Sequence, residues 1–194
     1  MSDTSEWNDC RGGYVLGIGS NIDPEANSIR ILARLIEKFG PVLVSRLYYT
    51  TPSGMVSDRR FVNFCAVIRT ELAPEACKSV CVAIEAALGR DRSAPDCKVS
   101  DRPADIDLLL RLPSRNPDPR DVAGADYLLQ PTRELLALLK GDDVPAAGER
   151  LCLLRKLPDA PATIDRDDRG CLVVVGEDRL GGERDGLHAA FRAE

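Results

Sequence analysis

Two aspartates, Asp105 and Asp107, stand two residues apart just after Arg102 and Pro103. The three residues that follow them are leucines, so the run is predicted to be a buried strand. Side chains two apart on a strand share a face, which brings both carboxylates together beside an arginine. Such a pair repels itself unless cations neutralise it, and Mg²⁺ prefers carboxylate oxygens together with substrate phosphates. One prediction is therefore a magnesium site; the alternative is that one aspartate pairs with Arg102 and the other is solvated.

Composition limits the classes of protein to which this chain can belong. Its 194 residues suffice for one domain with a core, and its 44% hydrophobic and 29% charged residues are typical of globular proteins. The net charge of −5 argues against a nucleic-acid or anionic-membrane partner, and no apolar run is long enough to span a bilayer. The first residues show no signal-peptide pattern, so we expect a cytoplasmic protein.

Cysteine and histidine chemistry is mostly excluded. The seven cysteines include no C-x-x-C pair, although Cys77 and Cys81 are four apart on an expected helix. The single histidine, His188, leaves a Cys/His zinc cluster without nitrogen ligands and removes histidine-dependent nucleophile schemes. We expect the cysteines to be reduced residues, mostly in the core.

The hydrophobic pattern predicts the order strand, helix, strand, strand, helix, strand. This is the βαββαβ ferredoxin-like arrangement of the α+β class, with an antiparallel sheet and its helices on one face. The loop at 50–60 is longer than a hairpin needs, which is typical of functional loops. The expected strands are 14–19, 42–49, 61–70 and 102–112, and the expected helices are 24–39 and 73–88.

The domain is predicted to span residues 13–140, with a further helix at 127–139 packed on it. Residues 1–12 are expected to be disordered, and 141–194 to form a partly ordered C-terminal extension with a strand-like run at 171–175.

Four patches follow one another along the first 108 residues. They are Leu16-Gly17-Ile18-Gly19-Ser20-Asn21; Tyr49-Thr50-Thr51-Pro52-Ser53-Gly54 with Phe61-Val62-Asn63; Ile84-Glu85-Ala86-Ala87-Leu88-Gly89-Arg90-Asp91-Arg92; and Arg102-Pro103-Ala104-Asp105-Ile106-Asp107-Leu108. In their order and spacing these patches resemble the 6-hydroxymethyl-7,8-dihydropterin pyrophosphokinase family of folate synthesis, although each patch alone is weakly specific. A weaker trace of the resemblance continues through residues 117–120 and 127–131.

The resemblance implies transfer of diphosphate from ATP to the hydroxymethyl group of the dihydropterin, with release of AMP. It implies ATP as co-substrate and two Mg²⁺ ions held by Asp105 and Asp107. It implies that Asn63 reads the amide edge of the pterin, and that Phe61 and Tyr127 stack on its two faces. The implied catalytic residues are Arg90, Arg92 and Arg102; the nucleotide-binding residues are Arg90, Arg92, Lys98, Arg102 and Arg120; the pterin-binding residues are Thr51, Pro52, Gly54, Phe61, Asn63 and Tyr127.

The expected partners are these small molecules, without nucleic acid or membrane. The sequence does not fix the oligomeric state, and a monomer is one expectation.

Some residues depart from the family pattern. Asp118 stands where the family usually has a histidine, and residues 123–126 lack the arginine that usually precedes the stacking tyrosine. Ser100 and Asp101 replace a small residue and a proline, and Val99 replaces a tryptophan. These departures keep open a diverged pterin-binding or regulatory paralogue with weak or no kinase activity. An unrelated ferredoxin-like module is a third hypothesis.

Overall fold

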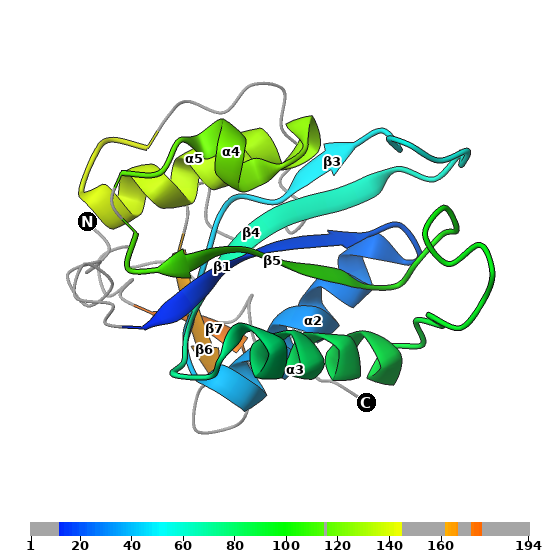
Figure 1. The fold of residues 1–194 in the computed structure, drawn as a ribbon, viewed down its shortest axis with the longest axis horizontal. Helices are drawn as coiled ribbons and strands as arrows, with labels where there is room; N and C mark the ends of the chain where they lie inside the picture. The colour runs from blue at the N-terminus through cyan, green and yellow to red at the C-terminus, as the bar shows by residue number, and fades with distance from the viewer. Residues whose placement is uncertain (1–11, 115, 145–161, 167–171, 176–194) are drawn as a thin grey trace, which may run out of the picture.

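The computed structural model describes residues 12–114, 116–144, 162–166 and 172–175. They form an α+β structure in which one antiparallel sheet is covered by helices (Figure 1). The elements are β1 (Gly13–Ser20), α2 (Pro24–Phe39), β2 (Val42–Val44), β3 (Tyr48–Thr50), β4 (Phe61–Arg69), α3 (Pro74–Ala87), β5 (Asp105–Leu112), α4 (Pro119–Ala123), α5 (Asp126–Lys140), β6 (Ala162–Arg166) and β7 (Leu172–Val175).

The sheet confirms the predicted βαββαβ ferredoxin-like arrangement. Its strand order is β5-β1-β4-β2-β6-β7, and β3 also pairs with β4. β1 and β4 pair along their whole length, from Gly13 opposite Arg69 to Ser20 opposite Val62. These two strands, which both carry site residues, are therefore fixed in register over eight residue pairs.

Helices cover both faces of the sheet. The amphipathic α2 and α3 pack on one face, as predicted, over a core that includes Leu16, Ile31 and Phe64. The prediction of helices on one face was incomplete, because α4 and α5 pack on the opposite face (Figure 1). There Leu128 and Leu135 of α5 cover a second apolar cluster. This second layer leaves only one end of that face for a ligand.

Two predicted strands differ in the structure. The strand expected at 42–49 is broken between β2 and β3, where Ser45 Oγ accepts the N–H of Cys65 at 2.9 Å. The strand with the two aspartates, β5, lies at the edge of the sheet, which the sequence did not indicate. Its leucines gave the pattern of a buried strand because α3 and the α4–α5 layer cover its two faces.

The C-terminal extension contributes to the sheet. β6, which was not predicted, pairs with β2, and β7 matches the strand-like run expected at 171–175. Most of the predicted extension and the predicted disordered N-terminus lie outside the described residues.

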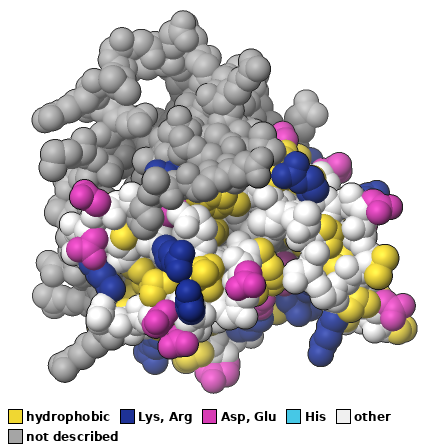
Figure 2. Space-filling view, turned by 90° about the horizontal axis from the view of Figure 1, so that it is seen from above, with side chains coloured by type: hydrophobic (Ala, Val, Ile, Leu, Met, Phe, Trp, Pro, Cys, Tyr) yellow, Lys and Arg dark blue, Asp and Glu magenta, His cyan; other side chains and the backbone are white. Residues whose placement is uncertain are grey.

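Charged side chains of both signs are interspersed on the described part of the face shown in Figure 2. Among the described helices, none combines the length and the apolar character needed to cross a membrane. Cys65, Cys77 and Cys81 are buried free thiols, as predicted, and burial raises the pKa of Cys65 and Cys81 to about 12.

Candidate active site

The register of three strands brings the predicted site residues into rows across the sheet. Gly19 of β1 lies opposite Asp105 of β5 on one side and Asn63 of β4 on the other. Gly17 lies opposite Asp107 and Cys65 in the next row. Cys65 contacts Thr132 of α5 at 3.5 Å, so these rows face the α5 layer.

The two glycines of β1 hollow this face. A Cβ at Gly19 would come within 2.6 Å of Asn63 Oδ1, and one at Gly17 within 2.7 Å of Leu128 Cδ1. Because real Cβ atoms do not approach so closely, side chains at these positions would displace the residues around them. The glycines therefore form the floor of a cavity of about 160 Å³.

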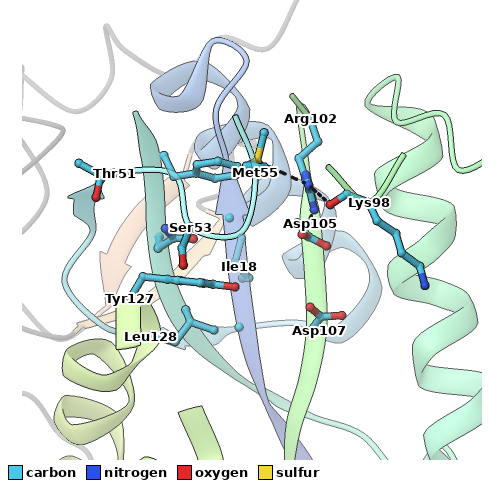
Figure 3. Close-up of a pocket in the computed structure, with 14 residues that line it drawn as sticks. Ile18, Thr51, Ser53, Met55, Lys98, Arg102, Asp105, Asp107, Tyr127 and Leu128 are labelled. Atoms are coloured by element: carbon cyan, nitrogen blue, oxygen red, sulfur yellow. Dashed lines mark hydrogen bonds and ion pairs between the residues drawn. The ribbon is translucent and has the colours of Figure 1, made fainter. Parts of the chain in front are cut away.

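Most of the predicted residues meet in this cavity (Figure 3). Thr51 comes from the loop between β3 and β4, the two aspartates lie one after the other along β5, and Tyr127 enters from the start of α5. The predicted residues that line the cavity are Thr51, Phe61, Asn63, Lys98, Arg102, Asp105, Asp107 and Tyr127.

Other predicted residues are not among those that line it, namely Pro52, Gly54, Arg90, Arg92 and Arg120. Ser53 also lines it, within the stretch 52–54 whose backbone was expected to contact the pterin. No role was predicted for the other residues that line it, namely Gly17, Ile18, Gly19, Met55 and Leu128. For the two glycines, the alternating Gly-x-Gly inside a buried strand was the available signal.

Asn63 is held at one end of the cavity. Its side chain is almost fully buried, and its amide nitrogen donates to Thr50 Oγ1 at 2.6 Å. Phe61 and Tyr127 line the same cavity from β4 and α5. Burial raises the pKa of Tyr127, and the negative charges of Asp105 and Asp107 raise it further. Two rings and a fixed amide are groups that suit a flat heterocycle with polar edges.

Asp105 is neutralised by two arginines. Its carboxylate pairs with Arg90 Nη1, and its second oxygen accepts from Arg102 Nη1 at 2.8 Å. Burial acts to raise the pKa of Asp105, but the hydrogen bonds and charges of Arg90 and Arg102 outweigh it and lower that pKa. Asp105 is therefore ionised at neutral pH, and the pairing with Arg102 matches the alternative prediction for one aspartate.

Asp107 is the more accessible carboxylate, with 62% of its side chain exposed. Lys78 of α3 donates to its Oδ1 at 2.8 Å. The alternative prediction of a simply solvated second aspartate is therefore incomplete, because a lysine from another element pairs with it.

A buried glutamate anchors the two arginines that follow α3. Glu85 is fully buried, and its carboxylate accepts from Arg90 Nη1 at 3.2 Å and from Arg92 Nε at 2.7 Å. It also accepts the backbone N–H of Ile106, which lies between the two aspartates, at 2.7 Å. Only 7% of the Arg90 side chain is exposed, against 39% for Arg92. In this arrangement Arg90 braces Asp105 from behind the cavity.

The carboxylate pair fits a magnesium ion that also binds phosphate. Both aspartates line one polar cavity, and carboxylate oxygens are the hard ligands that Mg²⁺ prefers. The described residues include no group of three or more histidine, cysteine or acidic side chains that could hold a metal. Two carboxylates are enough when substrate phosphates and water complete the coordination, as is usual for Mg²⁺.

Comparison with known proteins agrees with this geometry. Residues 15–137 match the family described as 7,8-dihydro-6-hydroxymethylpterin-pyrophosphokinase (HPPK). The chain belongs to this family. The matched residues include every predicted site residue and reach from β1 almost to the end of α5.

Curated relatives support the HPPK assignment. A 2-amino-4-hydroxy-6-hydroxymethyldihydropteridine pyrophosphokinase of Porphyromonas gingivalis is 34% identical over 97 residues, covering 49% of this chain and 66% of that protein. One of Methylorubrum extorquens is 39% identical over 100 residues, 48% of this chain and 60% of the relative. One of Bacillus subtilis is 31% identical over 98 residues, 49% and 57% of the two chains. The chain therefore spans somewhat less than two thirds of the length of these relatives.

Two of the departures from the HPPK pattern, Asp118 and Asp101, have local structural roles. Asp118 is the N-cap of α4, where its side chain accepts the N–H of Arg120 at 2.8 Å, and it does not line the cavity. Asp101 accepts from Asn21 Nδ2 at 2.6 Å and from Ser57 Oγ at 2.7 Å. One departure thus caps a helix, and the other joins loops that surround the cavity.

Proposed function

We propose that the chain transfers the β,γ-diphosphate of ATP to the hydroxymethyl oxygen of 6-hydroxymethyl-7,8-dihydropterin, releasing AMP, in folate biosynthesis. The observation that carries this proposal is the single cavity in which the Asn63 amide, two aromatic rings and the Asp105–Asp107 pair meet in a member of the HPPK family. One end of that cavity suits a flat heterocycle, and the other suits phosphate with a divalent cation.

The pterin is assigned to the end formed by Asn63, Phe61 and Tyr127. Asn63 is held by Thr50, so its amide is in place before the ligand arrives and loses little freedom on binding. Thr51 and the backbone at Pro52 and Gly54 are proposed to complete the pterin contacts.

The phosphates are assigned to the side of the cavity where Arg102 lies against Asp105, with Lys98 lining the same cavity. Arg102 already contacts Asp105, and its second nitrogen donates to the carbonyl of Lys98 at 2.7 Å. Two magnesium ions at Asp105 and Asp107 would neutralise the phosphate oxygens and ease attack at the β-phosphorus. The part of the protein is then to hold the hydroxymethyl oxygen in line with that phosphorus and to exclude water.

Arg90, Arg92 and Arg120 are kept as proposed phosphate contacts. Arg90 and Arg92 are paired with Glu85, so they reach a phosphate only if the loop at 88–104 moves when ATP binds. Arg102, which lines the cavity, is the arginine that we expect to act without such a movement.

The alternative of a non-catalytic paralogue was motivated by Asp118 and by the missing arginine at Ala125. An acid beside ATP would repel it, but the Asp118 carboxylate is engaged as the N-cap of α4, and the match to the HPPK family runs through both positions. The enzyme is therefore the better supported function. The cytoplasmic location and the monomeric state stay predictions. The lack of a nucleic-acid partner stays one too, and the mixed charges on the face in Figure 2 favour it.

The test is AMP formation from ATP, Mg²⁺ and the hydroxymethyl-dihydropterin by the full chain. Because the carboxylates hold the metal, changing both to alanine (D105A/D107A) should lower the rate by at least about a hundredfold. Asp96→Ala, at an exposed position of the loop before β5, is the matched control and should stay within about twofold. Equal rates of AMP formation in the double variant and the native chain would refute the proposed enzymatic activity. The affinity for the pterin alone, measured by calorimetry on native and Asn63→Ala protein, then tests the hypothesis of a pterin-binding paralogue.

A further inference from the structure

Lys78 is a cation beside the proposed metal site that neither the family resemblance nor the function has used. It lies on the second turn of α3 and reaches the edge strand β5. Its ammonium donates to the carbonyl oxygen of Ile106 at 2.6 Å and to Asp107 Oδ1 at 2.8 Å. A single lysine thus contacts both the backbone and the acid at the more exposed half of the carboxylate pair.

The contact with the backbone fixes the position of this charge. Among the described strands, β5 pairs with β1 alone, so no described strand bonds to the outer N–H and carbonyl of Ile106. α3 supplies both partners, because Glu85 accepts the N–H and Lys78 donates to the carbonyl. An ordinary surface ion pair lacks such an anchor, since both of its side chains move freely in solvent.

The charge of Lys78 opposes the binding of divalent cations. An ammonium is a compact positive charge, and this one lies against an oxygen that the metal would need. A cation that binds Asp107 must displace Lys78 from Oδ1 or share the carboxylate with it, and either costs Coulomb energy. Asp105 is already paired with two arginines. The competition between Lys78 and a divalent cation therefore takes place at Asp107.

We propose that Lys78 is a positioning residue that acts as the resident counter-ion of Asp107 and limits how tightly the cavity binds divalent cations before ATP arrives. The inference rests on the proposed function, because it takes Asp107 as a metal ligand. With Lys78 in place, the site favours the metal that comes with ATP, whose phosphates supply the missing negative charge and ligands.

The experiment measures Mn²⁺ binding, by electron paramagnetic resonance of the free ion, with and without α,β-methylene-ATP. Lys78→Met removes the charge and should bind Mn²⁺ about three- to tenfold more tightly than the native protein in the absence of nucleotide. Lys78→Gln removes the charge but keeps a donor for Ile106, and should show the same gain. Lys78→Arg, and Lys38→Met on the exposed side of α2, should stay within about twofold of native.

Salt separates an electrostatic role from a structural one. The gain of Lys78→Met should shrink as the ionic strength rises from about 0.05 to 0.5 M, because screening removes the repulsion. Affinity equal to or below native in both neutral variants would overturn the inference. If the native chain fails to bind Mn²⁺ even with the ATP analogue, the metal site of the proposed function has failed. If Asp107→Asn loses binding while the neutral Lys78 variants match native, only the role of Lys78 has failed.

Discussion

At Gly19 the site depends on a missing side chain. The residue lies between Asp105 and Asn63 in the row across the sheet, and its Cα faces the cavity. An added Cβ would meet Asn63 Oδ1 at 2.6 Å, and Asn63 cannot easily move because Thr50 accepts from its amide. The polar edge proposed to bind the pterin therefore owes its position to a glycine on the neighbouring strand.

Gly19→Ala should accordingly weaken pterin binding at least about tenfold, with the Asn63 amide turned from its position. Isothermal calorimetry with 6-hydroxymethyl-7,8-dihydropterin gives the affinity. Gly12→Ala is the matched control, because its Cβ would meet the end of the Glu71 side chain, which can rotate aside, and Gly12 is not among the residues that line the cavity. We expect a loss within about threefold there, and an equal loss in both variants would contradict the assignment of Asn63.

At the scale of elements, the sequence predicted the features that depend on local period. Asp105 and Asp107 are two residues apart, which predicted that they share one face of a strand, and both line the cavity. The hydrophobic period, with a proline at the start and a glycine at the end of each helix, predicted the bounds of α2 and α3 to within a residue or two. The family resemblance brought Asn63, Phe61 and Tyr127 to the same site, although α5 is distant in the chain.

Contacts between elements were beyond that kind of prediction. Arg90 follows a helix in a polar stretch, which favoured a solvent-facing phosphate clamp, yet buried Glu85 turns it towards Asp105. Lys78 gave no signal, since a lysine on a helix is usually a solvated charge. Whether such a residue faces solvent or another strand depends on how α3 packs on β5, and no local pattern encodes that packing.

The loops around the cavity are joined through Asp101. Its carboxylate accepts from Asn21 after β1 and from Ser57 in the loop before β4, and it lies 3.4 Å from Arg59. The hydrogen bonds from Ser57 and Asn21 lower the pKa of Asp101, with smaller contributions from nearby arginines. A carboxyl with a lowered pKa stabilises the folded form above its unfolded pKa and loses that effect as pH falls through the folded value. The junction should therefore be unchanged between about pH 5 and 8 and open only below about pH 4.

Asp101→Ala should loosen both loops at neutral pH. We expect amide hydrogen exchange in residues 53–60 and 92–101 to rise about fivefold, as for the loss of about 1 kcal/mol of hydrogen bonding. Asp91→Ala is the control, because the described hydrogen bonds of Asp91 stay within its own turn, to Ser93 and to the backbone of Ala94. It should raise exchange near residue 93 alone, whereas unchanged exchange at 53–60 in Asp101→Ala would show that the loops are held otherwise.

At the scale of the whole molecule, a buried acid joins the α5 layer to the sheet. Glu134 of α5 is fully buried and accepts the backbone N–H of Arg46 at 3.0 Å, in the break between β2 and β3. Its other oxygen accepts from the Arg46 guanidinium at 2.9 Å and from the hydroxyl of Tyr48. Burial raises the pKa of Tyr48 to about 12, and Glu134 contributes to the rise, so the phenol stays a donor. Glu134 explains why the predicted single strand is broken between β2 and β3. It accepts the backbone N–H of Arg46, which in a continuous strand would bond to the neighbouring strand.

The same contact links two elements that lead to the cavity. Tyr48 begins β3, which leads to Thr50 and so to Asn63, while α5 begins at the cavity with Tyr127 and Leu128. Glu134 holds these two elements against each other about two helical turns from Tyr127. Its substitution should therefore affect the stability of the whole sheet-and-helix assembly.

Glu134→Gln should lower the free energy of unfolding by about 3 kcal/mol, because it leaves the partly buried Arg46 guanidinium without its counter-ion. For a chain of this length that corresponds to a melting temperature lower by about 6 to 12 °C, measured by calorimetry or circular dichroism. Glu37→Gln in the exposed Arg34–Glu37 pair of α2 is the matched control, and a change within about 2 °C is expected there. If both variants melt together, Glu134 contributes no more than a surface pair, and the packing of Leu128 and Leu135 alone holds α5 on the sheet.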